Sequence, residues 1–78
     1  MRTKVAVPKH LKGLPKRLKA LRLKRKLTQT ELADIIGIPY FTILRLEGGI
    51  NQPSYPILLA LVRVLDTTTD YLLMGRKP

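Results

Sequence analysis

The sequence of 78 residues contains no cysteine and no tryptophan, and it has a single histidine, His10. Without cysteine the chain can form neither a disulfide nor a thiolate zinc site, and one histidine cannot assemble a metal centre. We therefore expect no metal and no cofactor, and we interpret His10 as a solvated residue.

Long apolar runs are also missing. No run approaches the roughly 20 residues of a membrane-spanning helix, and the N-terminus lacks the apolar core and small-residue cleavage site of a signal peptide. We expect a soluble, cytoplasmic protein that does not enter a membrane. The chain also has no phosphate-binding glycine loop, no second histidine and no acid pair in a recognisable catalytic arrangement, so we expect no enzyme.

Acidic residues are absent from the first thirty positions, although the whole chain carries a net charge of +10. From Leu27 onward, four basic residues face five acidic ones, so the charge surplus lies before that point. The basic residues there are Arg2, Lys4, Lys9, Lys12, Lys16, Arg17, Lys19, Arg22, Lys24, Arg25 and Lys26. Such a segment is either a solvated surface that maintains solubility or a footprint for a polyanion. The lack of intervening acids, which would form intrahelical pairs, favours nucleic acid.

A chain of this length forms one small domain, and an all-helical core is economical at this size. Residues 1–15 contain two prolines, one glycine and no apolar periodicity, which predicts an extended basic arm. Over residues 16–27, Leu18 and Leu21 recur at helical spacing and predict the first helix. Leu23 falls off that face, where it is exposed or covered by the arm.

Residues 28–47 predict two short helices joined by a tight turn. Thr28 followed by Glu31 three residues later is the pattern of a capping box, in which side chains and backbone N–H groups pair reciprocally. Gly37 follows where a residue of positive φ turns the chain sharply. A proline shortly after it fits a first helical turn, so the second helix of the unit covers about residues 39–47.

Two further helices follow. Ser54 is the expected N-cap of the fourth helix, and a last short helix follows Thr68. The inner face of the fourth helix is formed by Leu58, Leu61, Val62 and Leu65. No segment has strand alternation or hairpin chemistry. The sequence therefore predicts an all-α, compact bundle of about five helices over residues 16–75, with residues 76–78 as a tail.

The chain resembles the phage-repressor and Cro-like helix-turn-helix family, also called the Xre family, over nearly all of residues 14–75. The matching positions are Leu21-Arg22, Leu27-Thr28-Gln29, Glu31-Leu32-Ala33, Gly37-Ile38, Ile43, Leu46-Glu47-Gly48-Gly49, Pro53-Ser54, Leu58, Leu65 and Thr69-Asp70-Tyr71-Leu72-Leu73. The resemblance implies a lambda-repressor-like domain whose second unit helix enters the DNA major groove. It also implies a transcriptional regulator, a repressor that binds a near-palindromic operator in double-stranded DNA as a dimer.

A helical wheel places Tyr40, Phe41, Leu44 and Arg45 on one face of that helix, and we expect them to read bases. Arg45 is suited to the O6 and N7 of guanine, or alternatively to a phosphate, whereas Phe41 and Leu44 suit a thymine methyl group. Relatives usually carry polar residues at the first two positions. Tyr40 and Phe41 therefore contact either DNA or, alternatively, the arm or a protein partner.

The resemblance also implies contacts at the edge of this face. Gln29 would touch a phosphate or an outer base from a helix N-terminus, which attracts anions. Arg22 and Glu47 match a family salt bridge between the first and third helices, and a donor from Arg22 to DNA is the alternative. Contacts to the DNA backbone are expected from Thr42, Asn51, Gln52, Lys16, Arg17 and Lys19.

Apolar residues off the inner face of the fourth helix, namely Ile57, Leu59 and Val64, indicate an interface. The family's dimer region corresponds here to Pro56, Ile57, Thr67, Tyr71 and Met74. Scattered surface leucines, which need no partner, are the alternative. A two-fold dimer would set its two recognition helices about 34 Å apart.

Two other functions are consistent with the sequence. One is an antitoxin-type helix-turn-helix protein that neutralises a toxin and regulates its own operon, so a toxin or the transcription machinery is a possible protein partner. The other is membrane association through a basic amphipathic first helix, which the continuous core disfavours.

Overall fold

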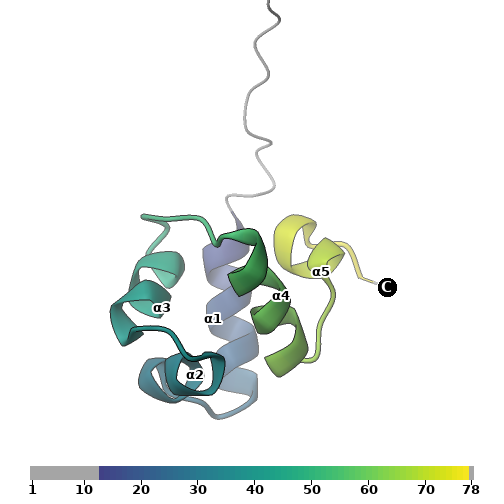
Figure 1. Ribbon diagram of the computed structural model, residues 1–78. Helices are drawn as coiled ribbons and strands as arrows, with labels where there is room; N and C mark the ends of the chain where they lie inside the picture. The colour runs from purple at the N-terminus through teal and green to yellow at the C-terminus, as the bar shows by residue number, and fades with distance from the viewer. Residues whose placement is uncertain (1–12, 78) are drawn as a thin grey trace, which may run out of the picture.

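The structure, a computed structural model, describes residues 13–77 and contains five helices in that range (Figure 1). They are α1 (Leu14–Lys24), α2 (Gln29–Ile36), α3 (Tyr40–Glu47), α4 (Tyr55–Val64) and α5 (Thr69–Met74). The predicted all-α fold is confirmed. Within the described range, no helix is long and apolar enough to cross a bilayer. Residues 1–12 of the expected arm, including His10, lie outside the described residues.

The first helix begins earlier than its sequence pattern indicates. Leu14 is the first residue of α1 and is 4% exposed, so residues 14 and 15 belong to the helical core and not to an arm. Pro15 lies in the first turn, where its missing N–H has no helical acceptor to lose. The helix also ends earlier, at Lys24, and the positive φ of Lys26 turns the chain towards α2.

The helix-turn-helix unit forms through its predicted local signals. The Thr28 hydroxyl accepts a hydrogen bond from the Glu31 N–H at 3.0 Å, and the Thr28 N–H donates to the Glu31 carboxylate at 2.9 Å. Gly37 has a φ of +87°, the left-handed conformation that favours glycine. Pro39 is the N-cap of α3 and not its first residue, so α3 begins at Tyr40.

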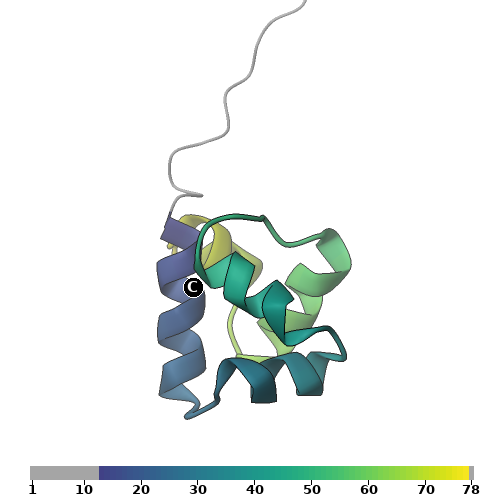
Figure 2. The ribbon, with the colours of Figure 1, turned by 90° about the vertical axis from the view of Figure 1, so that its left-hand side faces the viewer.

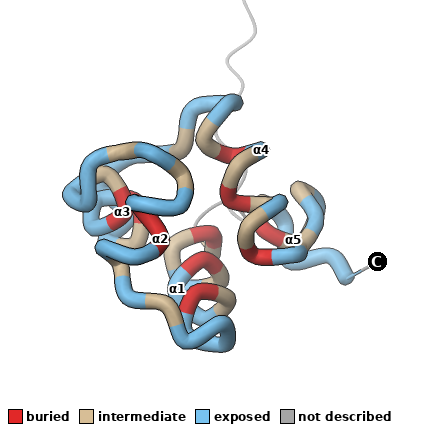
Figure 3. The backbone as a smooth tube through the Cα atoms, turned by 60° about the horizontal axis from the view of Figure 1, so that its bottom comes forward, coloured by how far each residue is buried: buried red, intermediate tan, exposed pale blue. Residues whose placement is uncertain are grey.

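The core lies where all five helices meet. Figure 2 shows α1 standing upright, with α2 across its lower end and α3 above α2. α3 packs against α1 and α2, while α4 contacts α2 and α5, and α5 returns to α1. Figure 3 shows the buried positions of the helices turned towards the interior. The buried apolar residues are Leu14, Leu18, Leu32, Ala33, Ile43, Leu46, Leu58, Leu61, Leu65 and Leu72.

Apolar positions outside the predicted helix faces divide into two groups. Ile57 and Val64 are partly buried against the core, so they are less available to a partner than their spacing indicates. Leu59 is 36% exposed, and Leu23 is 55% exposed. Of these four residues, Leu59 and Leu23 therefore add apolar surface to the outside of the bundle.

Candidate nucleic-acid interface

One face of α3 is open to solvent along its whole length. Tyr40, Phe41, Leu44 and Arg45, which we call the outer face of α3, are all exposed. On the opposite side of the helix, Ile43 and Leu46 are at most 1% exposed and hold α3 in the core. The structure thus presents the four side chains expected to read bases on a helix that is anchored from behind.

Two residues of the outer face contact each other. The guanidinium carbon of Arg45 lies 5.2 Å from the centroid of the Phe41 ring, one helical turn earlier. A cation within about 6 Å of an aromatic face is attracted by the ring quadrupole. Arg45 therefore has a preferred position above Phe41, which the sequence spacing allows but does not specify.

The back of α3 is held by an ion pair with α1. Arg22 Nε donates to Glu47 Oε2 at 2.6 Å, and Arg22 Nη2 donates to Glu47 Oε1 at 3.0 Å. The two side chains are 8% and 4% exposed. A third donor, Arg22 Nη1, donates to the Leu27 carbonyl at 2.7 Å, which ties the turn between α1 and α2 to the same ion pair. The salt bridge that the family resemblance implies is therefore present, and each of the three guanidinium nitrogens makes a hydrogen bond.

Glu47 stabilises the charged form of its partner. Its hydrogen bonds, and secondarily its negative charge, raise the pKa of Arg22 above its ordinary value, although burial acts in the opposite direction. The guanidinium therefore stays charged despite its burial. A permanent charge in a nearly closed site requires the carboxylate beside it.

Gln29 joins this ion pair. Its side-chain N–H donates to Glu47 Oε1 at 3.1 Å, so α1, α2 and α3 meet at one carboxylate. The residue is half-buried at the first position of α2. The sequence predicts a Gln29 that faces DNA, and no spacing signal indicates this contact with Glu47. In the structure the Gln29 amide is bound to the Glu47 carboxylate, whose ion pair with Arg22 holds α3 against α1.

The expected phosphate contacts lie in different surroundings. Lys16 and Lys19 are exposed on α1, and Asn51 and Gln52 are exposed in the loop that follows α3. Thr42 is half-buried in the first turn of α3, where its N–H donates to the Pro39 carbonyl. These side chains come from three elements: α1, α3 and the α3–α4 loop.

Arg17 has a role that the sequence did not indicate. Its Nε donates to the Leu72 carbonyl at 3.0 Å, and its Nη2 donates to the Leu73 carbonyl at 2.9 Å. The last carbonyls of a helix lack partners within the helix and carry the negative end of its dipole, so a cation is favourable there. Arg17 thereby fastens α5 to α1.

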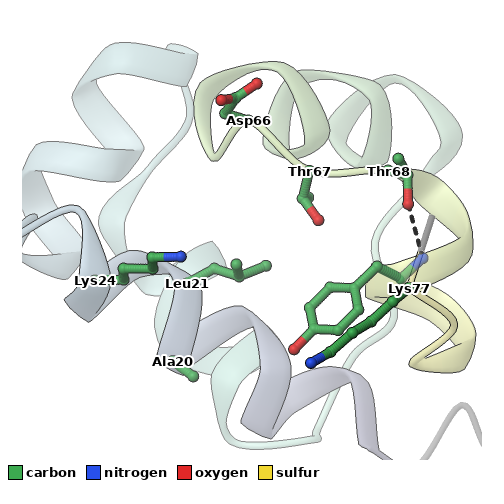
Figure 4. Close-up of a pocket in the computed structure, with 8 residues that line it drawn as sticks. Ala20, Leu21, Lys24, Asp66, Thr67, Thr68 and Lys77 are labelled. Atoms are coloured by element: carbon green, nitrogen blue, oxygen red, sulfur yellow. Dashed lines mark hydrogen bonds between the residues drawn. The ribbon is translucent and has the colours of Figure 1, made fainter.

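The residues expected at a dimer interface do not form a single cluster around one groove. A groove of about 500 Å³ lies between α1, the α4–α5 turn and α5, where Leu21 and Thr67 point towards each other (Figure 4). Thr67 and Tyr71 line it, together with Ala20, Leu21, Lys24, Asp66, Thr68 and Lys77. Met74 is 38% exposed at the end of α5. Pro56 and Ile57 belong to the first turn of α4 and do not line this groove.

Apolar exposure that the sequence did not indicate occurs beside the α3–α4 loop. Ile50 is 73% exposed and Tyr55 is 71% exposed. Neither residue belongs to a helical apolar stripe, so periodicity did not single them out. Both residues therefore add exposed apolar surface between the end of α3 and the start of α4.

Comparison with known proteins agrees with this geometry. A helix-turn-helix family model matches residues 18–72. The HTH-type transcriptional regulator YqaE of Bacillus subtilis is 40% identical over 58 residues, and the repressor protein C2 of Salmonella phage P22 is 36% identical over 59 residues. These alignments cover 74% and 76% of this chain, which spans only 50% of YqaE and 27% of C2.

Solved structures show the same arrangement of helices. The P22 c2 repressor in complex with a synthetic operator superimposes with a TM-score of 0.78 at 33% identity, over 81% of this chain and 96% of that chain. The solution structure of the P22 c2 DNA-binding domain gives a TM-score of 0.75 at 31% identity, over 96% and 88% of the two chains. A SinR protein/SinI protein complex gives 0.73 at 26% identity, over 77% and 59%.

Proposed function

The chain belongs to the helix-turn-helix family of phage-repressor and Cro-like proteins, and from this premise we propose that it is a transcriptional regulator that binds one DNA sequence specifically. The observation that carries the proposal is the outer face of α3. An exposed Arg45 stands on a helix whose opposite side is locked into the core. A rigid helix with one solvent-facing set of side chains is what insertion into a major groove requires.

Arg45 is the main polar reader of bases in this proposal. Its planar fork matches the O6 and N7 acceptors of guanine, a contact that discriminates by roughly 1 to 3 kcal/mol. Tyr40, Phe41 and Leu44 add an aromatic and apolar surface that suits thymine methyl groups, with the Tyr40 hydroxyl available to a phosphate or a base acceptor. The preferred sequence is therefore expected to combine guanine with thymine.

Contacts to the DNA backbone supply affinity that does not depend on the base sequence. Accessibility supports this part of the proposal: Lys16, Lys19, Asn51 and Gln52 are exposed, and Thr42 is half-buried. Gln29, at the N-terminus of α2, adds a contact to a phosphate or an outer base in this proposal. Binding through these cations releases counterions, so the affinity falls steeply as salt rises.

A symmetric dimer is the expected binding form. The surface around Thr67, Tyr71 and Met74 offers half-buried and exposed side chains at one end of the bundle, and Pro56 and Ile57 extend the proposed interface. A two-fold pair places two recognition helices about 34 Å apart, which matches successive major-groove faces of a near-palindromic site. Covering a promoter in this way makes the protein a repressor. The repressor C2 of phage P22 supports this direction of control.

A protein partner is the second candidate, because Ile50 and Tyr55 are mostly exposed. An antitoxin-type protein would cover a toxin with such a surface and bind its own operator as well. One structural neighbour, the SinR protein/SinI protein complex, is an assembly of two proteins. A small toxin encoded beside this chain and co-purifying with it would support this candidate.

In-vitro selection of bound DNA from a random duplex pool tests the proposal. We expect enrichment of one near-palindromic sequence, with guanines at fixed positions. The spacing of the half-sites reports the dimer, since two recognition helices in one assembly require a defined separation. A pool that stays random after repeated rounds would exclude sequence-specific binding.

A further inference from the structure

The Arg45 side chain is exposed, but it is not free to rotate without restraint. Its guanidinium lies 5.2 Å from the centre of the Phe41 ring. Among residues 13–77 no acidic group pairs with Arg45, so Phe41 is the side chain that fixes its direction. An arginine side chain has many rotamers, and the contact with Phe41 removes part of that freedom before any ligand arrives.

The contact leaves the recognition chemistry of Arg45 available. A ring that holds the guanidinium through its charge and its flat surface does not use the in-plane N–H donors, which stay available to acceptors. Arginine recognises guanine with those donors, through a planar fork. The stack on Phe41 therefore selects the orientation of the fork and consumes none of its hydrogen bonds.

The Phe41 ring is itself 48% exposed, so part of its surface faces outward beside the guanidinium. Phe41 precedes Arg45 by one turn, and the N-terminal residues of a recognition helix lie nearest the base edges. In the major groove, the apolar group that such a ring can meet is the methyl group at C5 of a pyrimidine. Ring and guanidinium are thus positioned to contact neighbouring base pairs.

We infer that Phe41 is a positioning residue for Arg45 and that the two residues read one dinucleotide step, a guanine next to a 5-methylpyrimidine. Both thymine and 5-methylcytosine present the required methyl group, so this step contains either base. The inference rests on the proposed function, because it needs Arg45 to face bases.

The first test needs no DNA. In NMR spectra of the full chain, the ring current of Phe41 should shift the side-chain signals of Arg45 upfield. Phe41→Leu should remove this shift, Phe41→Tyr should retain it, and Tyr40→Leu should leave it unchanged. Arg45 signals that are the same in the wild type and in Phe41→Leu would overturn the positioning role.

The second test uses the duplex obtained by selection, with each contacted guanine replaced in turn by 7-deazaguanine, which lacks the N7 acceptor. Because an exposed cation–π contact is worth about two- to fivefold in an equilibrium constant, Phe41→Leu should reduce the preference for guanine by about that factor. Phe41→Tyr should restore it. Tyr40→Leu, the matched control, should keep the wild-type ratio even where its overall affinity is lower. Equal losses of preference in Phe41→Leu and Tyr40→Leu would overturn the inference.

The third test concerns the methyl group. Replacing the thymine beside the guanine with uracil should weaken wild-type binding by about three- to fivefold, the effect of burying one methyl-sized group, and 5-methylcytosine should bind better than cytosine. Both differences should shrink in Phe41→Leu. Specific binding that ignores the methyl group would overturn the dinucleotide inference and leave the proposed function intact. Absence of any sequence preference in the wild type would instead overturn both.

Discussion

Arg22 and Glu47 bind each other across the boundary between α1 and α3, with contacts of 2.6 and 3.0 Å and no more than 8% of either side chain exposed. The same carboxylate accepts a hydrogen bond from Gln29 of α2. Three helices are therefore oriented around one negative charge. The position of α3, and with it the proposed contact with DNA, depends on this pair.

Removing one partner should be much more harmful than removing both. Arg22→Met or Glu47→Leu leaves an uncompensated buried charge, and we expect each to lower the free energy of unfolding by about 3 to 5 kcal/mol. The double variant should be less destabilised than either single variant, since its site is apolar and neutral. Urea denaturation of the four proteins measures this, and losses below about 1 kcal/mol in both single variants would contradict it.

The stability that the charged Arg22 contributes should not change at moderately alkaline pH. Glu47 raises the pKa of Arg22 above its ordinary value, so the stabilisation is fully present below the pKa of the unfolded chain and is lost only as the pH rises through the higher folded pKa. The difference in unfolding free energy between the wild type and Arg22→Met should therefore be the same at neutral pH and at about pH 10. A difference that falls towards zero over this interval would mean that Arg22 is not held as a charged group.

The turn between α2 and α3 should need glycine at position 37 for its backbone conformation and not for lack of space. Gly37 has a φ of +87°, and a Cβ placed there would meet no atom within 4 Å. We expect Gly37→Ala to lower stability by about 1 to 2 kcal/mol, the usual penalty of a left-handed residue. Gly37→Asn should lose less, because asparagine tolerates this conformation. Thermal unfolding measures both, and an alanine variant as stable as the wild type would contradict the argument.

Arg17 should matter for α5 more than for affinity towards DNA. Its two hydrogen bonds to the Leu72 and Leu73 carbonyls are the contacts that Arg17→Met removes. Hydrogen bonds from a charged donor contribute about 1.5 to 3 kcal/mol, so amide exchange in α5 should become roughly ten- to a hundredfold faster. Lys16→Met is the matched control on the same helix, and its α5 protection should remain that of the wild type. Equal protection in both variants would exclude the capping role of Arg17.

The local signals in this sequence were sufficient for most of the fold. Thr28, Ser54 and Thr68 are the N-caps of α2, α4 and α5 because each side chain accepts a hydrogen bond from an N–H three residues later, a relation that spacing alone reveals. The start of α1 was predicted wrongly. Leu14 and Pro15 look like the end of an arm, and only the burial of Leu14 against other helices shows that they are helical.

The interface was less predictable, because its decisive contacts join distant positions. Gln29 and Glu47 are 18 residues apart, and Arg17 and Leu72 are 55 residues apart. No periodicity links such pairs. Arginine and glutamine are mostly found exposed on protein surfaces, so their presence in the sequence does not indicate a contact inside the bundle. The Phe41 and Arg45 contact lies within one helix, yet helical spacing permits many pairs and cannot say which side chains stack.

The most direct test of the central claim is an equilibrium binding measurement on the full chain at physiological salt, with the selected duplex and a scrambled duplex of the same length and composition. A sequence-specific regulator should prefer its own site by roughly a thousandfold or more. Arg45→Ala should reduce that preference at the guanine positions, while its affinity for the scrambled duplex stays similar. Equal wild-type affinity for the two duplexes would contradict the account.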